Sequence, residues 1–314
     1  MRTAPIRLAT RGSPLALIQA GLVVASLRAT GVSAEPVVVE TSGDRRRDVP
    51  IHAIGGQGVF VKDVDTAVLE GSADASVHSA KDLPSSPPRP AAGPAAGPAA
   101  GELPIAAFLP RSDPRDALVG QRLAMLQAGA RIATGSVRRR AQLAWLRPDL
   151  SFEEVRGNMA TRLERVPPGG AVVVAMAALV RLGLQNRAAQ VLSSREMLPQ
   201  VGQGAIAICC RPEDDEVLSR IAAIDDAGAR AAVTAERAWL RATGGGCDLP
   251  VGAHATVGAG ATITLEAMIA SLDGHVIVRQ RQSGDDAETL GAELARSMLS
   301  AGGGRALLEG GAAL

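Results

Sequence analysis

A cysteine at the end of a glycine run is the residue of this chain best placed for chemistry. Cys247 follows three consecutive glycines at 244–246, and the segment before them, 231–242, has the composition of a helix. Glycine lets the backbone bend freely beyond a helix end, whereas structural cysteines usually lie inside apolar strands. The sequence therefore predicts that the Cys247 thiol is presented rather than buried.

The other two cysteines and the four histidines give no comparable signal. Cys209 and Cys210 lie in the apolar segment 205–210 and are expected to be core thiols. The histidines show no metal-ligand spacing, so no metal site is predicted. Three cysteines without a targeting segment are typical of a reducing cytoplasm.

Arginine and hydroxyl side chains gather where predicted strands meet helices. Two segments, 9–13 and 133–139, share the order strand, short turn and capped helix, with arginine close to the turn. Guanidinium forks and the N–H groups of a helix start bind carboxylates or phosphates. The pattern predicts two similar domains that bind a ligand with several anionic groups. Two ordinary capped helices with solvated arginines remain an alternative. The set consists of Arg11, Ser13, Thr134, Ser136, Arg138, Arg139, Arg156 and Arg162.

An ammonium and a carboxylate stand side by side at another strand end, in the segment 77–84. Lys81 and Lys62 are the only lysines in an arginine-rich chain. Asp82 would either pair with Lys81 or cap a turn, or act as an ionised carboxylate that stabilises positive charge and shuttles protons. Lys81 and the arginines favour the ionised form of Asp82, and both roles remain open here.

Strand and helix patterns alternate along most of the chain, which predicts an α/β protein of three domains. Domain 1 would comprise 1–104 and 204–222, domain 2 would comprise 105–200, and domain 3, with the cysteine loop, 226–314. Residues 90–104 are an Ala-Gly-Pro repeat, expected to be a surface insertion. Expected strands are 6–10, 36–40, 73–78, 131–134, 151–155, 171–176, 204–210, 262–270 and 275–281. Expected helices are 13–29, 59–70, 136–146, 159–166 and 287–299.

Composition argues against two classes of partner. The net charge of +1 provides no field for nucleic acid or an acidic membrane, and 2% aromatic residues leave few stacking platforms for bases. The longest apolar run, 171–179, is about half of a membrane span. The chain is therefore expected to act on a small anionic molecule.

Seven motifs in this order resemble the porphobilinogen deaminase (hydroxymethylbilane synthase) family. Together they are highly specific, because they extend over nearly the whole chain. They are LATRGSPLAL at 8–17, GGQGVFVK at 55–62, VHSAKDLP at 77–84, DPRDA at 113–117, RGN at 156–158, LPQVGQG at 198–204 and GGC at 245–247.

The resemblance implies two lobes similar to those of periplasmic binding proteins and a third domain that carries a dipyrromethane cofactor on Cys247 through a thioether. It implies a transferase that joins four porphobilinogen molecules head to tail, with loss of ammonia. Asp82 would stabilise the cationic azafulvene intermediates and assist proton transfer. Cofactor-binding positions would be Ser79, Lys81, Asp82, Thr134, Ser136, Arg138, Arg139 and Gln203. Substrate-binding positions would be Arg11, Ser13, Phe60, Arg156 and Arg162.

Some residues depart from the family pattern. Gln57 and Ala53 replace residues that are often charged, which weakens the electrostatic hold of the segment 41–58. Cys209 replaces a usual glutamate. The expected protein is a cytoplasmic monomer; the alternative is a two-lobed anion-binding module without catalysis, which would have no need of the Cys247 thiol.

Overall fold

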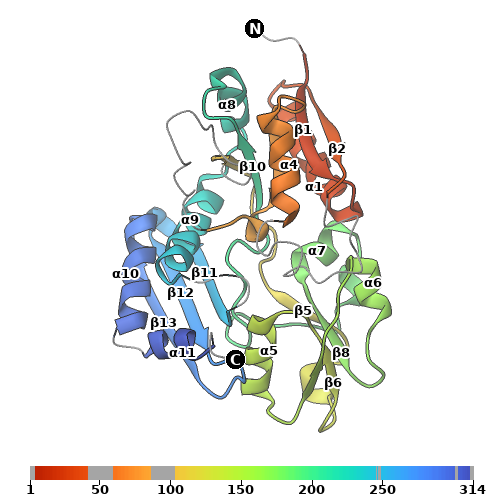
Figure 1. Ribbon diagram of the computed structural model, residues 1–314, viewed down its shortest axis with the longest axis vertical. Helices are drawn as coiled ribbons and strands as arrows, with labels where there is room; N and C mark the ends of the chain where they lie inside the picture. Colours follow the sequence, from red (N-terminus) through yellow and green to blue (C-terminus); the bar gives the residue numbers. More distant parts are fainter. Residues whose placement is uncertain are drawn as a thin grey trace. The chain divides into compact units, whose positions relative to one another are not determined.

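The computed structural model describes residues 4–41, 59–85, 103–244, 246, 249–300 and 303–311 (Figure 1). The chain divides into two compact units. Unit 1 comprises the residues up to 111 together with 205–230, and unit 2 comprises 112–204 together with 231–314. Each unit is built around its own sheet or sheets.

Unit 1 contains a five-stranded sheet in the order β2-β1-β3-β10-β4. β1 is parallel to β2 and β3, whereas β10 is antiparallel to β3 and β4. The strand residues alternate between two faces, so α1 and α8 share one core cluster and α4 packs into another. The elements are β1 Ile6–Arg11, α1 Pro14–Ala29, β2 Ala34–Val39, α4 Val59–Leu69, β3 Ala75–Ser79, the 3₁₀ turn η1 Ala80–Asp82, β4 Ile105–Phe108, β10 Ile206–Cys210 and α8 Asp215–Ala222.

The first sheet of unit 2 repeats this arrangement in the order β7-β6-β8-β5-β9. β6 is parallel to β7 and β8, and β5 is antiparallel to β8 and β9. Helix α5 packs on one face, and α6 and α7 pack on the other. The elements are β5 Asp116–Gly120, η2 Leu123–Met125, β6 Arg131–Ala133, α5 Val137–Leu146, β7 Ser151–Glu153, α6 Met159–Glu164, β8 Ala171–Ala175, α7 Met176–Arg181, η3 Gln185–Arg187 and β9 Gln190–Val191.

A three-stranded antiparallel sheet, β11-β12-β13, follows in the same unit. Its core includes Trp239 of α9, which is fully buried. The turn before β13 packs closely on α5: a Cβ at Gly274 would lie 2.4 Å from the carbonyl oxygen of Ala141. The elements are α9 Ala227–Ala242, β11 Val251–Val257, η4 Ala259–Ala261, β12 Ile263–Ala270, β13 Ile277–Gly284, α10 Ala287–Ser300 and α11 Gly304–Gly311.

The predicted α/β class, with two similar sheets and a smaller third one, is confirmed. The sequence pattern placed the start of the second domain at residue 105. β4, at Ile105–Phe108, instead pairs with β10, so the first sheet extends beyond that boundary. No described helix combines the length and the apolar composition needed to cross a membrane.

Candidate active site

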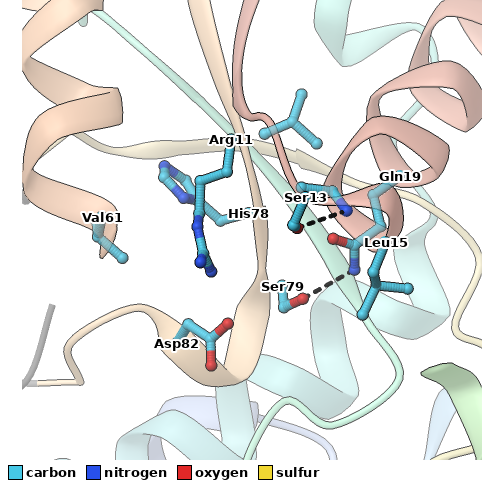
Figure 2. A pocket seen from close by; sticks show the side chains of 10 residues that line it. Arg11, Ser13, Leu15, Gln19, Val61, His78, Ser79 and Asp82 are labelled. Carbon is cyan, nitrogen blue, oxygen red and sulfur yellow. Dashed lines mark hydrogen bonds between the residues drawn. The ribbon is translucent and has the colours of Figure 1, made fainter. Parts of the chain in front are cut away.

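A pocket in unit 1 brings together four of the predicted site residues, Arg11, Ser13, Ser79 and Asp82 (Figure 2). They come from the end of β1, the start of α1, the end of β3 and the turn η1. Figure 2 shows the guanidinium of Arg11 extending into the space between β1 and η1, toward the side of the pocket where Asp82 lies. The pocket therefore holds a cation and an anion on neighbouring walls.

Helix capping fixes one wall of this pocket. Ser13 is the N-cap of α1, as predicted: its Oγ accepts from the backbone N–H of Ala16 at 3.3 Å, and Pro14 begins the helix. One turn further along, the buried side chain of Gln19 donates from Nε2 to Ser79 Oγ at 2.8 Å. The sequence analysis did not single out Gln19; its polarity in an apolar helix was the available signal.

The carboxylate of Asp82 is exposed on η1. Among the described residues it has no hydrogen-bond or ion-pair partner, so it neither caps a turn nor pairs with Lys81 there. Lys81 lies beside it and is half-buried. A carboxylate without a structural partner on a pocket wall is available to a ligand.

In unit 2, a buried ion cluster forms around Asp116. Its Oδ2 accepts from Arg138 at 2.8 Å, and its Oδ1 accepts from Arg139 at 2.7 Å and from Gln203 Nε2 at 2.9 Å. Asp116 and Gln203 are fully buried, and Arg138 and Arg139 are almost so. Thus three predicted cofactor-binding residues share one carboxylate that the sequence analysis did not assign to the site.

Charge in this cluster is unbalanced. Burial by itself would raise the pKa of Asp116, but the charges of Arg138 and Arg139 outweigh burial and hold that pKa well below its usual value. Two guanidinium groups face one carboxylate, which leaves one net positive charge. In addition, the buried Nε of Arg138 has no hydrogen-bond partner among the described residues. Both features favour an anionic ligand at this cluster.

The turn before α5 contributes the predicted hydroxyl groups. Ser136 is the N-cap of α5, and its Oγ accepts from the N–H of Arg139 at 3.4 Å. Thr134 Oγ1 accepts from the N–H of Ser136 at 3.2 Å. The repeated strand, turn and capped helix seen in the sequence therefore occupies equivalent places, after β1 in one sheet and after β6 in the other.

Arg156 precedes α6, and Arg162 lies in the last turn of this helix. Arg156 donates to Glu154 at 2.8 Å, and Nε of Arg162 donates to the Gly157 carbonyl oxygen at 2.9 Å. Both are partly exposed. The structure thus places them beside the β7–α6 turn, with surface still accessible.

Arg181, at the end of α7, is a candidate that the sequence analysis missed. Its guanidinium donates to the Gly204 carbonyl oxygen at 2.7 Å, and its buried Nε has no partner among the described residues. Burial lowers the pKa of Arg181 to about 10. The arginine follows an apolar strand and helix, and only the folded position shows that no described carboxylate pairs with it.

Several predicted positions lie outside the described residues. These are Cys247, Gln57, Ala53 and most of the segment 90–104. Phe60 belongs to α4, but its side chain is likewise not described. The predicted roles of these residues stay predictions.

Family models match almost the whole chain. "Porphobilinogen deaminase, dipyromethane cofactor binding domain" matches residues 6–219, and "Porphobilinogen deaminase, C-terminal domain" matches residues 230–300. The chain belongs to the porphobilinogen deaminase family. Its resemblance to that family, first seen in seven short motifs, is thereby confirmed.

Full-length relatives agree with this assignment. The chain is 45% identical over 308 residues to porphobilinogen deaminase of Acidothermus cellulolyticus, covering 95% of this chain and 89% of that one. It is 42% identical over 313 residues to porphobilinogen deaminase of Syntrophus aciditrophicus, covering 97% and 98%. Among solved structures, the methionine binding protein MetQ is similar at a TM-score of 0.43, with 11% identity and coverage of 72% and 91%.

Each unit, taken by itself, has donors or acceptors of the kind that the dipyrromethane group named by the family model would need. Such a group carries carboxylates and pyrrole N–H groups. The Asp116 cluster has an excess guanidinium charge and an unpartnered N–H for a carboxylate. Asp82 supplies an acceptor for N–H groups.

Proposed function

We propose that this chain joins four porphobilinogen molecules head to tail on a dipyrromethane carried by Cys247, with release of ammonia and, after hydrolysis, of linear hydroxymethylbilane. The observation that carries the proposal is the pocket of unit 1, where Asp82 and Arg11 line neighbouring walls and Asp82 has no partner among the described residues. Family membership supports the same reaction.

Some of the predicted side chains would bind the substrate, and others would bind the cofactor. Arg11 and Ser13 would bind the carboxylates of porphobilinogen, together with Arg156, Arg162 and Phe60. The cofactor would be held by Ser79, Lys81, Thr134, Ser136, Arg138, Arg139 and Gln203. When bound, dipyrromethane supplies the pyrrole carbon to which the first substrate molecule is joined.

Asp82 would act on the charge that develops during each condensation. A pyrrole ring that forms or loses a bond at its α-carbon becomes electron-poor, and its nitrogen carries positive charge. An ionised carboxylate that accepts the N–H stabilises this charge more in the transition state than in the ground state. Lys81, which precedes Asp82 in η1, is half-buried.

The Asp116 cluster would act before the first turnover. Its net positive charge is fixed by buried contacts, so it is present in the folded chain without any ligand. A carboxylate that binds there gains a charge-assisted hydrogen bond with little reorganisation. We infer that the cluster orients the cofactor, whereas the pocket of unit 1 performs the repeated chemistry.

We further infer that the protein is a cytoplasmic monomer and that porphobilinogen is its small-molecule partner. The net charge of +1 supports a small-molecule partner, and the small number of cysteines, three, supports the cytoplasm. An anion-binding module without catalysis is the competing function, and no described contact favours it over the enzyme.

Intact-mass measurement of the purified protein tests the proposal. The wild-type chain from a host that makes haem should be heavier by one dipyrromethane, and Cys247→Ser should have the mass of the bare polypeptide. Added porphobilinogen should be consumed by the wild type alone. A wild-type chain of bare mass that binds porphobilinogen without consuming it would establish the binding module instead.

A further inference from the structure

A histidine and a buried aspartate form a pair at the edge of the unit 1 pocket. His78, on β3, lines this pocket beside Arg11 and Asp82 and is 6% exposed (Figure 2). Its Nε2 lies 2.7 Å from Oδ1 of Asp65, on α4, which is 1% exposed. Ser76 Oγ donates to the same oxygen at 2.7 Å. None of the roles assigned above uses this pair.

Hydrogen-bond chemistry places the protons in this group. An ionised carboxylate only accepts hydrogen bonds, so Nε2 of His78 must carry the hydrogen that faces Asp65. A neutral imidazole then has its lone pair on Nδ1. Among the described residues no hydrogen bond reaches Nδ1. The imidazole is thus held by its hydrogen bond at Nε2, and its Nδ1 is able to accept a proton.

The charged groups around the imidazole come from three elements. Arg11 approaches from β1, Asp65 lies on α4, and Asp82 belongs to η1. The neighbouring strand β10 places the apolar Ala207 opposite His78. Within the described ranges, Asp65 is the residue that hydrogen-bonds to the ring, so it dominates the orientation of the imidazole.

We propose that His78 is a second acid–base residue of this pocket, held by Asp65 in the tautomer that leaves Nδ1 free to accept a proton. The inference rests on the proposed condensation. There, the attacking pyrrole carbon forms a C–C bond to the substrate methylene. The methylene C–N bond breaks, and its electron pair leaves with ammonia. The C–H bond of the attacking carbon also breaks, and its electron pair returns to the ring.

His78 Nδ1 accepts the proton released from that carbon and passes it to ammonia, which departs as ammonium. The imidazole is neutral again when the next substrate arrives. A neutral imidazole suits this step, because one ring nitrogen accepts a proton while the other keeps its hydrogen bond to Asp65. Asp82 then stabilises positive charge, and His78 moves the proton.

Three variants separate this role from a structural one. His78→Gln retains an amide N–H that can donate to Asp65 but has no group that accepts and releases a proton. Asp65→Asn retains the shape of the carboxylate but removes its charge. His275→Gln is the matched control, since His275 pairs with Asp273 at 2.9 Å on an exposed turn.

Each variant is isolated as holoenzyme, with thermal unfolding and intact mass as readouts independent of turnover. His78→Gln should unfold at the wild-type temperature and keep the dipyrromethane mass, yet lose about 100-fold in kcat with KM within threefold. Asp65→Asn should lose about 10-fold, and His275→Gln should match the wild type. Labelling of the histidines with ¹⁵N should show Nε2 protonated and Nδ1 unprotonated at pH 8 in wild-type His78, and a mixture of tautomers in Asp65→Asn.

A kcat within threefold of wild type for His78→Gln would overturn the proposal, as would a wild-type ring protonated at Nδ1. Loss of folding or of the dipyrromethane mass in His78→Gln would show a structural role and overturn it too. A wild-type protein that does not consume porphobilinogen would refute the proposed function instead, because the tautomer measurement requires no turnover.

Discussion

Replacing Asp116 by asparagine should strongly destabilise unit 2. The side chain is fully buried between Arg138 and Arg139, which are themselves 4% and 8% exposed. Asparagine has nearly the same volume, so the substitution removes the charge and leaves two buried guanidinium groups without an anion. Removal of one partner from a buried ion pair costs about 3–5 kcal/mol. In a unit of this size the midpoint of thermal unfolding should fall by roughly 10 °C.

Thermal unfolding followed by circular dichroism measures this effect, with Asp149→Asn as the control. Asp149 accepts from Arg147 at 2.6 Å, but the pair is at the surface, so its loss should leave the midpoint unchanged. If the free energy of unfolding of Asp116→Asn lies within about 1 kcal/mol of the wild-type value, the charge of Asp116 does not hold the cluster together. The charge argument for an anionic ligand would then fail as well.

The pH dependence of the same variant gives an independent check. The pKa of Asp116 is lowered in the folded chain, so its stabilisation is fully present above the unfolded value of about 3.9 and is lost as the pH falls through the folded value. The difference between wild type and Asp116→Asn should be constant from about pH 8 to 5 and shrink in stronger acid. A difference that grows on acidification would contradict the assigned direction.

Four further substitutions or reagents test the site. Asp82→Asn should keep the wild-type unfolding midpoint and lose at least about 100-fold in kcat, because its carboxylate has no described structural partner; near-normal turnover would remove Asp82 from the mechanism. Arg181→Gln should raise KM for porphobilinogen or reduce the fraction of chains with dipyrromethane, and an unchanged KM and mass would exclude an anion there. Gly252→Ala should also reduce the fraction of chains with dipyrromethane, since a Cβ would lie 2.9 Å from the Pro199 oxygen and 3.2 Å from Arg138 Cδ. An intact-mass measurement that finds the wild-type fraction would contradict this. Iodoacetamide should leave Cys210 unmodified in the folded protein, because burial raises the pKa of this thiol to about 11. Alkylated Cys210 in a peptide map would show that the reagent reaches β10 in the folded protein.

Local sequence predicted those elements whose signals are local. Ser13 followed by Pro14 determines where α1 begins, and Ser136 does the same for α5, because the cap depends on a side chain and N–H groups within one turn. Strand β11 was not predicted, although its partner β12 is adjacent in the sequence. Strands β4, β5 and β9 were not predicted either. Their pairing partners lie far away in sequence, and segments as short as Gln190–Val191 carry no periodicity of their own.

The sequence also placed the arginines near the site without revealing how they are held. A fully buried aspartate at the start of a strand contradicts the usual preference of charged residues for the surface, so Asp116 could not be assigned from its own segment. Only the fold brings it to Arg138 and Arg139, more than twenty residues away. The same is true of His78, whose partner Asp65 comes from a different element.

These contacts change what the predicted binding residues can do. Much of the guanidinium surface of Arg138 and Arg139 is already used by Asp116 and by the carbonyl oxygens of Leu198 and Val173. Arg138 and Arg139 therefore cannot bind a ligand carboxylate as two guanidinium groups with all their N–H groups free would. Their contribution is a fixed surplus of one positive charge, in a region where water provides little screening.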